Sequence, residues 1–251
     1  MRQRRNSGQI LLIAAFIMAS ILLSAQFYVL EVGKNMGEVQ QSSLTGFMLS
    51  VKFGSRHVVT GSLANASNAG SNSALELNLQ NWASFVHHQY TLGENVLEYT
   101  LREEIPYSSG IWLQWGSSGS GVSSAYADFL HRLSGREANA EQVYSINVTT
   151  SLIVTSTNRI VNATVRQIDV RMNVLNEGAP ALAKQIMIYY RVSGAWVIPN
   201  QSDGYSLQDY GNGTYMASFK AMSPTWPVEV SIHTTDCRDI FVRANATSID
   251  T

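Results

Sequence analysis

The five histidines are the side chains best suited to bind a metal or to move a proton. His87 and His88 are adjacent, and neighbouring positions on a helix point about 100° apart, so their rings do not converge on one ion. His57, His131 and His233 are far apart in the sequence, and no spacing predicts that they meet. The sequence therefore predicts no metal site.

The acidic and nucleophilic residues show no catalytic spacing either. Glu103 and Glu104 are neighbours, which fits a solvated loop better than a facing pair of carboxylates. No Gly-x-Ser-x-Gly motif occurs, and the Gly and Ser run at 116–121 lacks the lysine of a phosphate-binding loop. We therefore expect no enzyme activity and no cofactor.

The single cysteine, Cys237, cannot form an internal disulfide, so an apolar core must stabilise the fold. Asp236 and Asp239 beside it disfavour a thiolate, which predicts a small buried residue rather than a reactive thiol. A secreted chain without internal disulfides fits a bacterial or archaeal cell surface.

Asn-x-Ser/Thr triplets offer acceptors for N-glycosylation, a modification of surface and secreted proteins. The six triplets begin at Asn65, Asn147, Asn162, Asn200, Asn212 and Asn245. Five of the six fall in the carboxyl-terminal part, near expected turns or on strand faces. They predict glycosylation sites, although Asn and Thr are also simply common in exposed β-structure.

Composition favours an extracellular location and excludes nucleic acid as a partner. Only 14% of the residues are charged, and the formal net charge is −1. No run of Lys or Arg follows the amino-terminal cluster, so the basic stripe that phosphate contacts require is missing.

The apolar stretch 10–30 determines where the rest of the chain is placed. As a helix with a rise of about 1.5 Å per residue it would span about 31 Å, the thickness of a bilayer's hydrocarbon core. Arg2, Arg4 and Arg5 precede it and Glu31 follows it. The positive-inside rule then predicts a cytoplasmic basic segment at 1–9 and an extracellular location for the remainder.

Two other interpretations of this stretch compete with an anchor. A cleavable signal would need small residues before the cut, and the best candidate, Leu23-Ser24-Ala25, has Leu where a small residue is preferred. A buried helix of a globular core would usually keep a polar stripe, which this stretch lacks.

Apolar residues at helical spacing predict a helical stalk and linker at 31–72, weakened by glycines that each cost about 0.5–1 kcal/mol relative to alanine. Residues 73–142 indicate a mixed region. It contains a helix from Leu75 to Tyr90 and two short strands, whereas residues 126–133 fit either a helix or a strand.

From Val143 onward, apolar and polar residues alternate as in β-strands. A turn is expected at 157–159 and a bulge at Arg166 and Gln167. Further strands are expected at 185–192, 195–198, 214–221, 228–234 and 240–246. Residues 143–251 thus predict an antiparallel sandwich of immunoglobulin type. The predicted fold class is α+β, with a transmembrane helix and helical stalk before this β-sandwich.

Aromatic residues are frequent in the strand-rich part. They fit either a sandwich core, which is the more common use, or a contact surface for carbohydrate or protein. They are Trp112, Trp115, Trp196, Trp226, Tyr189, Tyr190, Tyr205, Tyr210 and Tyr215.

The amino terminus, Arg4-Arg5-Asn6-Ser7-Gly8-Gln9 and the apolar stretch after it, resembles the start of archaeal type IV pilin-like surface proteins. More loosely it resembles tight-adherence pilus proteins of bacteria. In prepilins a membrane peptidase cuts after the glycine, so the resemblance implies processing between Gly8 and Gln9. The Glu that aids assembly five residues into such mature chains is replaced here by Ile13. The strand before Asn176-Glu177-Gly178 resembles immunoglobulin-like adhesion modules of prokaryotic surface proteins.

We therefore expect a single-pass, membrane-anchored cell-surface protein with a structural or adhesive role, of which a minor pilin-like subunit is one form. Its expected partners are the lipid bilayer, through residues 10–30, and other pilin-like or surface-layer proteins. The alternative is an anchored extracellular enzyme or solute-binding module with its site in residues 75–143. Its candidate residues are His87, His88, Trp112 and Trp115.

Overall fold

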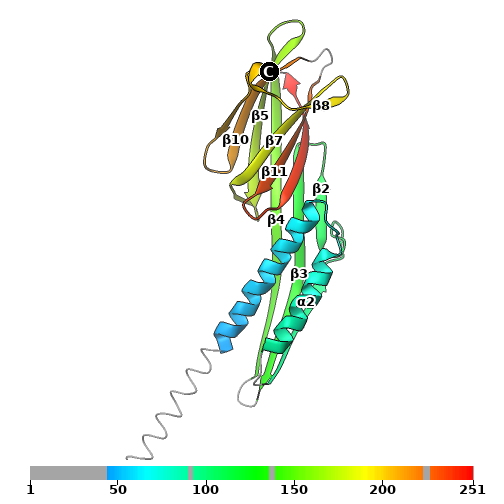
Figure 1. Cartoon of the computed structure of the whole chain (residues 1–251), viewed down its shortest axis with the longest axis vertical. Coiled ribbons are helices and arrows are strands. Elements are labelled where there is room, and N and C mark those ends of the chain that lie inside the picture. Colours follow the sequence, from blue (N-terminus) through cyan, green and yellow to red (C-terminus); the bar gives the residue numbers. More distant parts are fainter. Residues whose placement is uncertain (1–43, 90–92, 136–138, 223–226, 251) are drawn as a thin grey trace, which may run out of the picture. The chain divides into compact units, whose positions relative to one another are not determined.

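The computed structural model of this chain describes residues 44–89, 93–135, 139–222 and 227–250. The expected basic segment 1–9, with Gly8 and Gln9, and the expected membrane segment 10–30 lie outside these residues. The chain divides into two compact units, Met1–Val51 and Lys52–Thr251. The second unit contains all the strands of the described residues and is the subject of the following paragraphs (Figure 1).

Two α-helices come first in the described part. Residues 44–67 are helical, and we call them the first helix; α2 covers Ala74–Gln89. Leu75, Leu79 and Val86 form the buried stripe of α2, at the spacing that predicted a helix there. Within the described ranges, no helix combines the length and the hydrophobicity needed to cross a bilayer.

The larger sheet is antiparallel apart from its last short strand, β13, which runs parallel to β4. Its main strand order is β1-β3-β4-β5-β10-β9, with β2 beside β3 and β6 beside β5. The strands are β1 (Gly93–Leu101), β2 (Ile111–Trp115), β3 (Ser120–Gly135), β4 (Asn139–Ile160), β5 (Val165–Asn176), β6 (Ala179–Pro180), β9 (Ser206–Asp209), β10 (Thr214–Met222) and β13 (Ile249–Asp250).

The smaller sheet is antiparallel, in the order β12-β11-β7-β8. Its strands are β7 (Ala183–Val192), β8 (Ala195–Val197), β11 (Glu229–Asp236) and β12 (Phe241–Thr247). A short 3₁₀ turn, η1 (Gln201–Asp203), precedes β9. The strands expected from alternation in this part of the chain are confirmed within one or two residues at each end.

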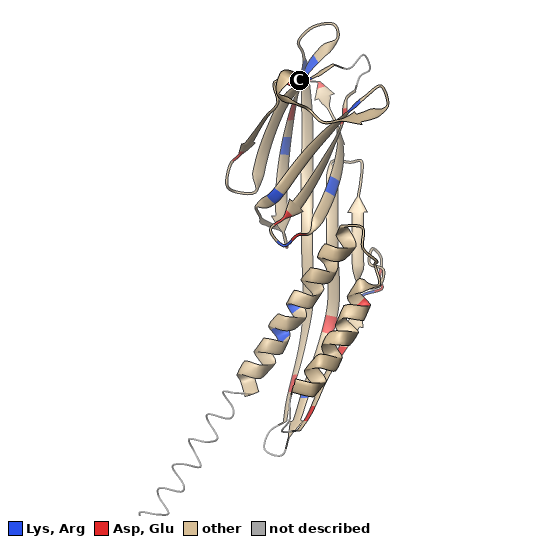
Figure 2. Cartoon of the chain, viewed as in Figure 1, with Lys and Arg blue, Asp and Glu red and all other residues tan. Residues whose placement is uncertain are grey.

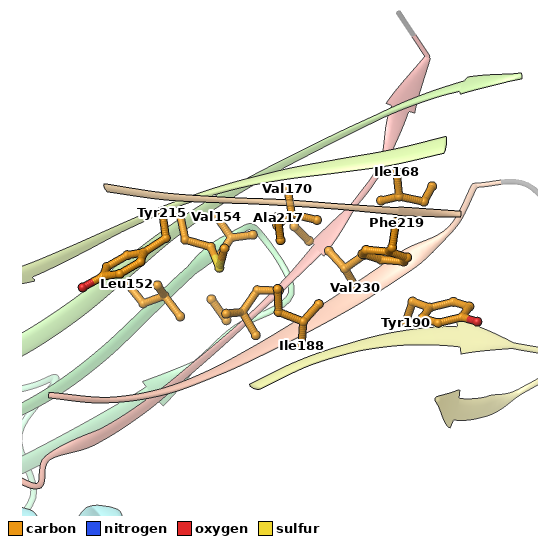
Figure 3. Close-up of a cluster of buried hydrophobic side chains, with 14 of the residues drawn as sticks. Leu152, Val154, Ile168, Val170, Ile188, Tyr190, Tyr215, Ala217, Phe219 and Val230 are labelled. Carbon is orange, nitrogen blue, oxygen red and sulfur yellow. The ribbon is translucent and has the colours of Figure 1, made fainter. Parts of the chain in front are cut away.

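One hydrophobic core lies between the two sheets. Inward-facing residues of β4, β5 and β10 pack against those of β7, β11 and β12, as Figure 3 shows for Leu152, Ile168, Phe219, Ile188 and Val230. The alternating pattern of each strand supplies one apolar face to this core, so the packing follows directly from the sequence. Two antiparallel sheets around a shared core are consistent with the expected sandwich.

β3 and β4 extend beyond this core. They are 16 and 22 residues long, and at about 3.3 Å per residue β4 spans roughly 70 Å. The turn after β4 lies beyond residue 160 rather than at 157–159. Ser156 and Asn158 are buried at inward positions, and these polar residues made the strand look shorter than it is. β4 and β5 keep one register throughout, so the bulge expected at Arg166 and Gln167 is absent.

The part of the unit that contains this core is its two-sheet half. In the other half, which we call the helix-covered half, β3 pairs with β1 on one side and with β4 on the other, and the two helices cover one face of the sheet (Figure 1). Phe129 of β3 and Tyr144 of β4 are buried there and stack with ring centroids 5.1 Å apart. The Oγ of Ser55 in the first helix lies 3.1 Å from Tyr144 Oη and accepts a hydrogen bond of 2.9 Å from Trp82 Nε1 of α2. This hydroxyl therefore links both helices to the sheet.

The predicted fold class, α+β with a membrane helix and helical stalk ahead of a sandwich, is wrong for the described residues, whereas the segment 10–30 lies outside them. The described residues are mostly strand, and neither helix among them can span a membrane. Residues 31–72 were expected to form a helical stalk. Residues 52–67 of this range are instead part of a helix that packs on a sheet. The sheet on which it packs comes from β1, β3 and the first half of β4. The sequence leaves residues 126–133 of β3 undecided, whereas it predicts a strand from Val143 onward.

Candidate functional site

Three of the six Asn-x-Ser/Thr triplets lie in exposed turns of one geometry. In each, Asn Oδ1 accepts a hydrogen bond from the backbone N–H two residues later, which is an Asx turn. The pairs are Asn162 with Thr164 N (3.0 Å), Asn200 with Ser202 N (2.8 Å) and Asn212 with Thr214 N (3.1 Å). This bond uses Oδ1 and not Nδ2, the atom that carries an N-linked glycan, so all three asparagines are well placed as acceptors.

The other three triplets lie within regular structure. Asn65 is exposed in the first helix, and Asn147 is exposed on β4, where its Oδ1 accepts from Thr149 Oγ1 at 3.1 Å. Asn245 is half-buried on β12, and its Oδ1 accepts from Ser231 Oγ at 2.6 Å. Access to the amide is therefore poorest at Asn245.

The outer face of the smaller sheet carries a continuous row of half-buried rings. Tyr189 of β7 lies 4.7 Å from His233 of β11, which lies 5.6 Å from Phe241 of β12. Phe241 in turn meets Trp115 of β2 at 5.2 Å, and the Arg243 guanidinium lies 5.7 Å above the Trp115 ring. We call these five residues the aromatic row. Partly exposed rings beside a guanidinium are suited to stack on sugar rings or on side chains of a partner.

Burial lowers the pKa of His233 in this row, and the charge of Arg243 lowers it further. Beside the row, Arg191 pairs with Glu229 at 2.8 Å and lies 6.0 Å from the ring of Trp196, which is 44% exposed. The outer face therefore combines rings with the charge of Arg243 beside them and with the Arg191–Glu229 pair at one end.

The remaining aromatic residues divide between core and surface. Tyr190 and Tyr215 are buried in the core, and Tyr205 packs against it. Tyr210 is half exposed, whereas Trp226 lies outside the described residues. Some of the aromatic residues named from the sequence therefore lie in the core, and others lie on the outer face of the smaller sheet.

The histidines make separate hydrogen bonds. His87 Nδ1 lies 2.8 Å from the carbonyl oxygen of Asn95, and His88 Nδ1 lies 2.7 Å from that of Ser84. His131 is fully buried, and its Nε2 lies 2.8 Å from Asn95 Oδ1. Burial lowers the pKa of His131. In the parts of the chain that the structure describes, no three His, Cys, Asp or Glu side chains cluster to hold a metal.

A shallow hollow of about 450 Å³ lies between the first helix and α2. Its lining is His57, Val58, Gly61, Ser62, Asn78, Asn81, Trp82 and Phe85. Trp82 and Phe85 stack with centroids 5.4 Å apart. None of the four residues expected for an enzyme or solute site lines this hollow, so it does not favour that alternative.

The turn between β11 and β12 contains a buried charge cluster that sequence reasoning missed. Asp236 is fully buried and accepts from Arg238 Nε at 2.8 Å and from Thr150 Oγ1 at 2.9 Å. The same guanidinium pairs with Glu177 at 2.6 Å and donates to the carbonyl oxygen of Thr149 at 3.0 Å. Because Glu177 and Thr149 lie 61 and 89 residues from Arg238, no local motif signals that they join Asp236 and Arg238 in this cluster.

The same turn also contacts the end of the first helix. Phe241 N donates to Ser67 Oγ at 3.0 Å, and Asn68 Nδ2 donates to the carbonyl oxygen of Asp239 at 2.9 Å. Cys237 lies at the tip of this turn and is exposed, contrary to the expectation of a buried residue. The turn thus joins the helix-covered half of the unit to the two-sheet half.

Neither a scan against protein-family models nor a search of curated proteins finds a match for this chain.

Proposed function

We propose that this protein is anchored in a membrane by its apolar segment 10–30 and presents residues 52–251 at the cell surface, where it has a structural or adhesive role. A minor pilin-like subunit is the form of that role that the amino-terminal resemblance supports. The carboxyl-terminal part carries glycans in this proposal, and its partners are the bilayer and other surface proteins.

The observation that carries the proposal is the set of three exposed Asx turns at Asn162, Asn200 and Asn212. Asparagines in such exposed turns can receive glycans only if the chain reaches the glycosylation enzymes that act outside the cytoplasm. The topology argument from Arg2, Arg4 and Arg5 independently supports an outward location.

The aromatic row supports the adhesive part of the role. Partly exposed rings on a sheet face form large, rigid contacts at a low cost in side-chain entropy. The exposed Trp196 and the Arg191–Glu229 pair at one end add polar contacts that fix the orientation of a partner.

Protease treatment of intact cells, followed by membrane fractionation, tests the location. We expect residues 52–251 to be cleaved from outside while the chain sediments with membranes. Full protection in intact cells together with a soluble chain after lysis would contradict the proposal.

Glycopeptide mass spectrometry of the native chain tests the acceptors. We expect mass additions on peptides with Asn162, Asn200 and Asn212, each lost in the matching Asn→Gln variant, and the lowest occupancy at Asn245. A chain that is exposed to protease but bears no glycan would leave the location standing and refute the glycosylation.

A further inference from the structure

The outer face of the larger sheet, opposite the two helices, places a glycan acceptor beside an aromatic ring. Phe129 and Tyr144 face the helices, so side chains an odd number of positions away on β3 and β4 point to the outer face. Tyr126 of β3 and Asn147 of β4 lie on this face and are directly paired in the ladder. Since Asn147 begins the triplet Asn147-Val148-Thr149, a glycan attached there would start beside Tyr126.

The backbone hydrogen bonds show how close these two side chains are. Tyr126 N donates to the carbonyl oxygen of Gly110 at 2.8 Å, on the side of β3 away from β4. Thr149 N donates to Glu177 Oε1 at 3.1 Å, on the side of β4 away from β3. Because outward-pointing groups alternate along a strand, the backbone groups of Asn147 also point away from β3. Tyr126 and Asn147 thus form a non-hydrogen-bonded pair, the type in which Cα atoms are about 4.5 Å apart and side chains are closest.

Arg102 covers Tyr126 from the side opposite Asn147. It follows β1 directly, on the side of β3 away from β4, and its guanidinium lies 4.8 Å from the centroid of the half-buried Tyr126 ring. Tyr126 Oη donates to Asp128 Oδ1 at 3.0 Å, which fixes the ring along its own strand. Because the guanidinium approaches from the side of β1, the side of the ring towards β4 is the one open to a sugar on Asn147.

The side-chain amide of Asn147 is oriented for the attachment of a sugar. Its Oδ1 accepts hydrogen bonds from Thr149 Oγ1 at 3.1 Å and from Ser124 Oγ at 3.2 Å. Both hydroxyls lie on the same side of Asn147, since Ser124 pairs with Thr149 in the ladder. Nδ2 is therefore directed away from them, and within the described ranges it has no hydrogen-bond partner.

Small neighbours leave room for a sugar beside Asn147. Ser145 and Thr149 flank it on the same face of β4, and Ser145 is exposed. β4 pairs with β5 only from Thr150 onward, so no described strand lies beside Asn147 on its far side. Asp128 is level with Ser145, is exposed and accepts a hydrogen bond from its hydroxyl. A carboxylate in this position can also accept a hydrogen bond from a sugar hydroxyl.

Two further half-buried rings extend the surface beside Tyr126. The ring of Tyr107 lies 6.1 Å from that of Tyr126 and 5.9 Å from that of Trp112 on β2. Charged side chains are sparse over the strands (Figure 2), and Arg102 already pairs with Glu104 at 3.4 Å. Rings with a few polar groups and little net charge suit an uncharged ligand rich in hydroxyls, such as a sugar.

We propose that Asn147 carries an N-linked glycan whose first sugar packs against the ring of Tyr126, so that the glycan lies on the sheet. Attachment joins Nδ2 to the anomeric carbon of a phosphate-linked sugar donor; Nδ2 loses a proton, and the phosphate leaves with the bonding electrons. Asp128 accepts a hydrogen bond from a hydroxyl of the bound sugar. This inference rests on the proposed glycosylation of a surface chain and gives one of its glycans a structural role.

Hydroxyl-radical footprinting of the native full-length chain in detergent, read by mass spectrometry, tests the contact. Tyr126 should be oxidised about twofold faster in Asn147→Gln than in the native chain, because the sugar covers much of the accessible ring. Wild-type chain made in a host without N-glycosylation should match Asn147→Gln, which excludes an effect of the substitution itself. Asn162→Gln removes a glycan from a turn and should leave Tyr126 protected. Tyr210, which is 50% exposed, is the internal reference.

A double-variant cycle on thermal unfolding measures the coupling between the glycan and the ring. With Tyr126 present, Asn147→Gln should lower the midpoint by about 2–4 °C, whereas in Tyr126→Ala it should change the midpoint little. Tyr126→Phe keeps the ring and loses only the bond to Asp128, so the effect of the glycan should persist in it. Equal shifts with and without the ring would overturn the inference.

Mass spectrometry of the native chain separates a failure of this inference from a failure of the proposed function. An unmodified Asn147 on a surface-located chain with glycans at Asn162, Asn200 or Asn212 would overturn the inference and leave the proposed function standing. A modified Asn147 beside a Tyr126 that is oxidised as fast as in Asn147→Gln would also overturn it. A chain that lies inside the cell and has no glycan would refute both.

Discussion

At the scale of single residues, the ion pair between Asp236 and Arg238 is the clearest case of a contact on which the local structure depends. Asp236 is fully buried, and both of its oxygens accept hydrogen bonds. Buried carboxylates are costly without such partners, so the turn between β11 and β12 is stable only in this arrangement.

Asp236→Asn should destabilise the fold by about 3 kcal/mol, because Arg238 then loses its fully buried counter-charge. Urea unfolding of the full-length chain in detergent measures the change. Asp239→Asn, three residues away in an exposed pair with Lys184, is the control and should have little effect. Equal effects of the two substitutions would contradict the role assigned to Asp236.

His131 should make the fold sensitive to acid. Burial lowers its pKa, so at a pH below about 6.5 the unfolded chain binds a proton there that the folded chain does not. Stability is therefore lost as the pH falls below that value. The urea midpoint should be lower at pH 5 than at pH 7, and His131→Gln should reduce this difference whereas exposed His88→Gln should not.

What the sequence could predict at this scale depends on whether a residue's partners are local. The Asx turn at Asn162 involves Thr164, two residues later, so it lies within the Asn-x-Thr triplet that the sequence already shows. Two partners of Arg238, Glu177 and Thr149, come from distant parts of the chain, so this cluster could not be anticipated. Cys237 was expected to be buried, but the left-handed turn at Asp239 places it at an exposed tip.

At the scale of elements, Gly54 allows the two helices to pack closely, although from the sequence alone this glycine is expected only to weaken the first helix. A Cβ on Gly54 would lie 2.3 Å from the ring of Trp82, and that ring is fixed by its hydrogen bond to Ser55. Gly54 therefore permits the close approach of α2, whereas a Cβ on Gly61 would meet nothing within 4 Å.

Gly54→Ala should cost about 1–3 kcal/mol through overpacking, and Gly61→Ala should stabilise the helix by about 0.5–1 kcal/mol. Thermal unfolding followed by circular dichroism measures both. The two substitutions are identical in chemistry and both are in the first helix, so opposite signs would isolate the contact with Trp82. Stabilisation by both would show that the ring moves aside freely.

Strands of the two-sheet half could be predicted because each alternates with one apolar face, as in β10 and β11. β3 could not be assigned, because residues 126–133 contain apolar side chains that suit either period. Its inward residues include Ala125, Ala127 and His131, which are small or polar but buried. The packing of the two helices on one face of the sheet depends on long-range contacts, which no local sequence pattern specifies.

At the scale of the whole molecule, the resemblance at the amino terminus gives a prediction about maturation. If the chain is processed like a prepilin, the mature protein begins at Gln9. Intact-mass measurement of the chain from its native membrane should then show the loss of residues 1–8, and substitution of Gly8 should retain them. A native chain that still begins at Met1 would separate a permanently anchored protein from a processed one.

The unbroken pairing of β3 with β4, from Ser120 to Ser134, has a mechanical consequence for the second unit. Tension applied along these strands is borne by many crosswise hydrogen bonds at once, since such bonds lie perpendicular to the strands. Under that load the bonds are sheared together instead of being peeled apart in sequence. The unit should therefore yield only at high force when it is pulled along these strands.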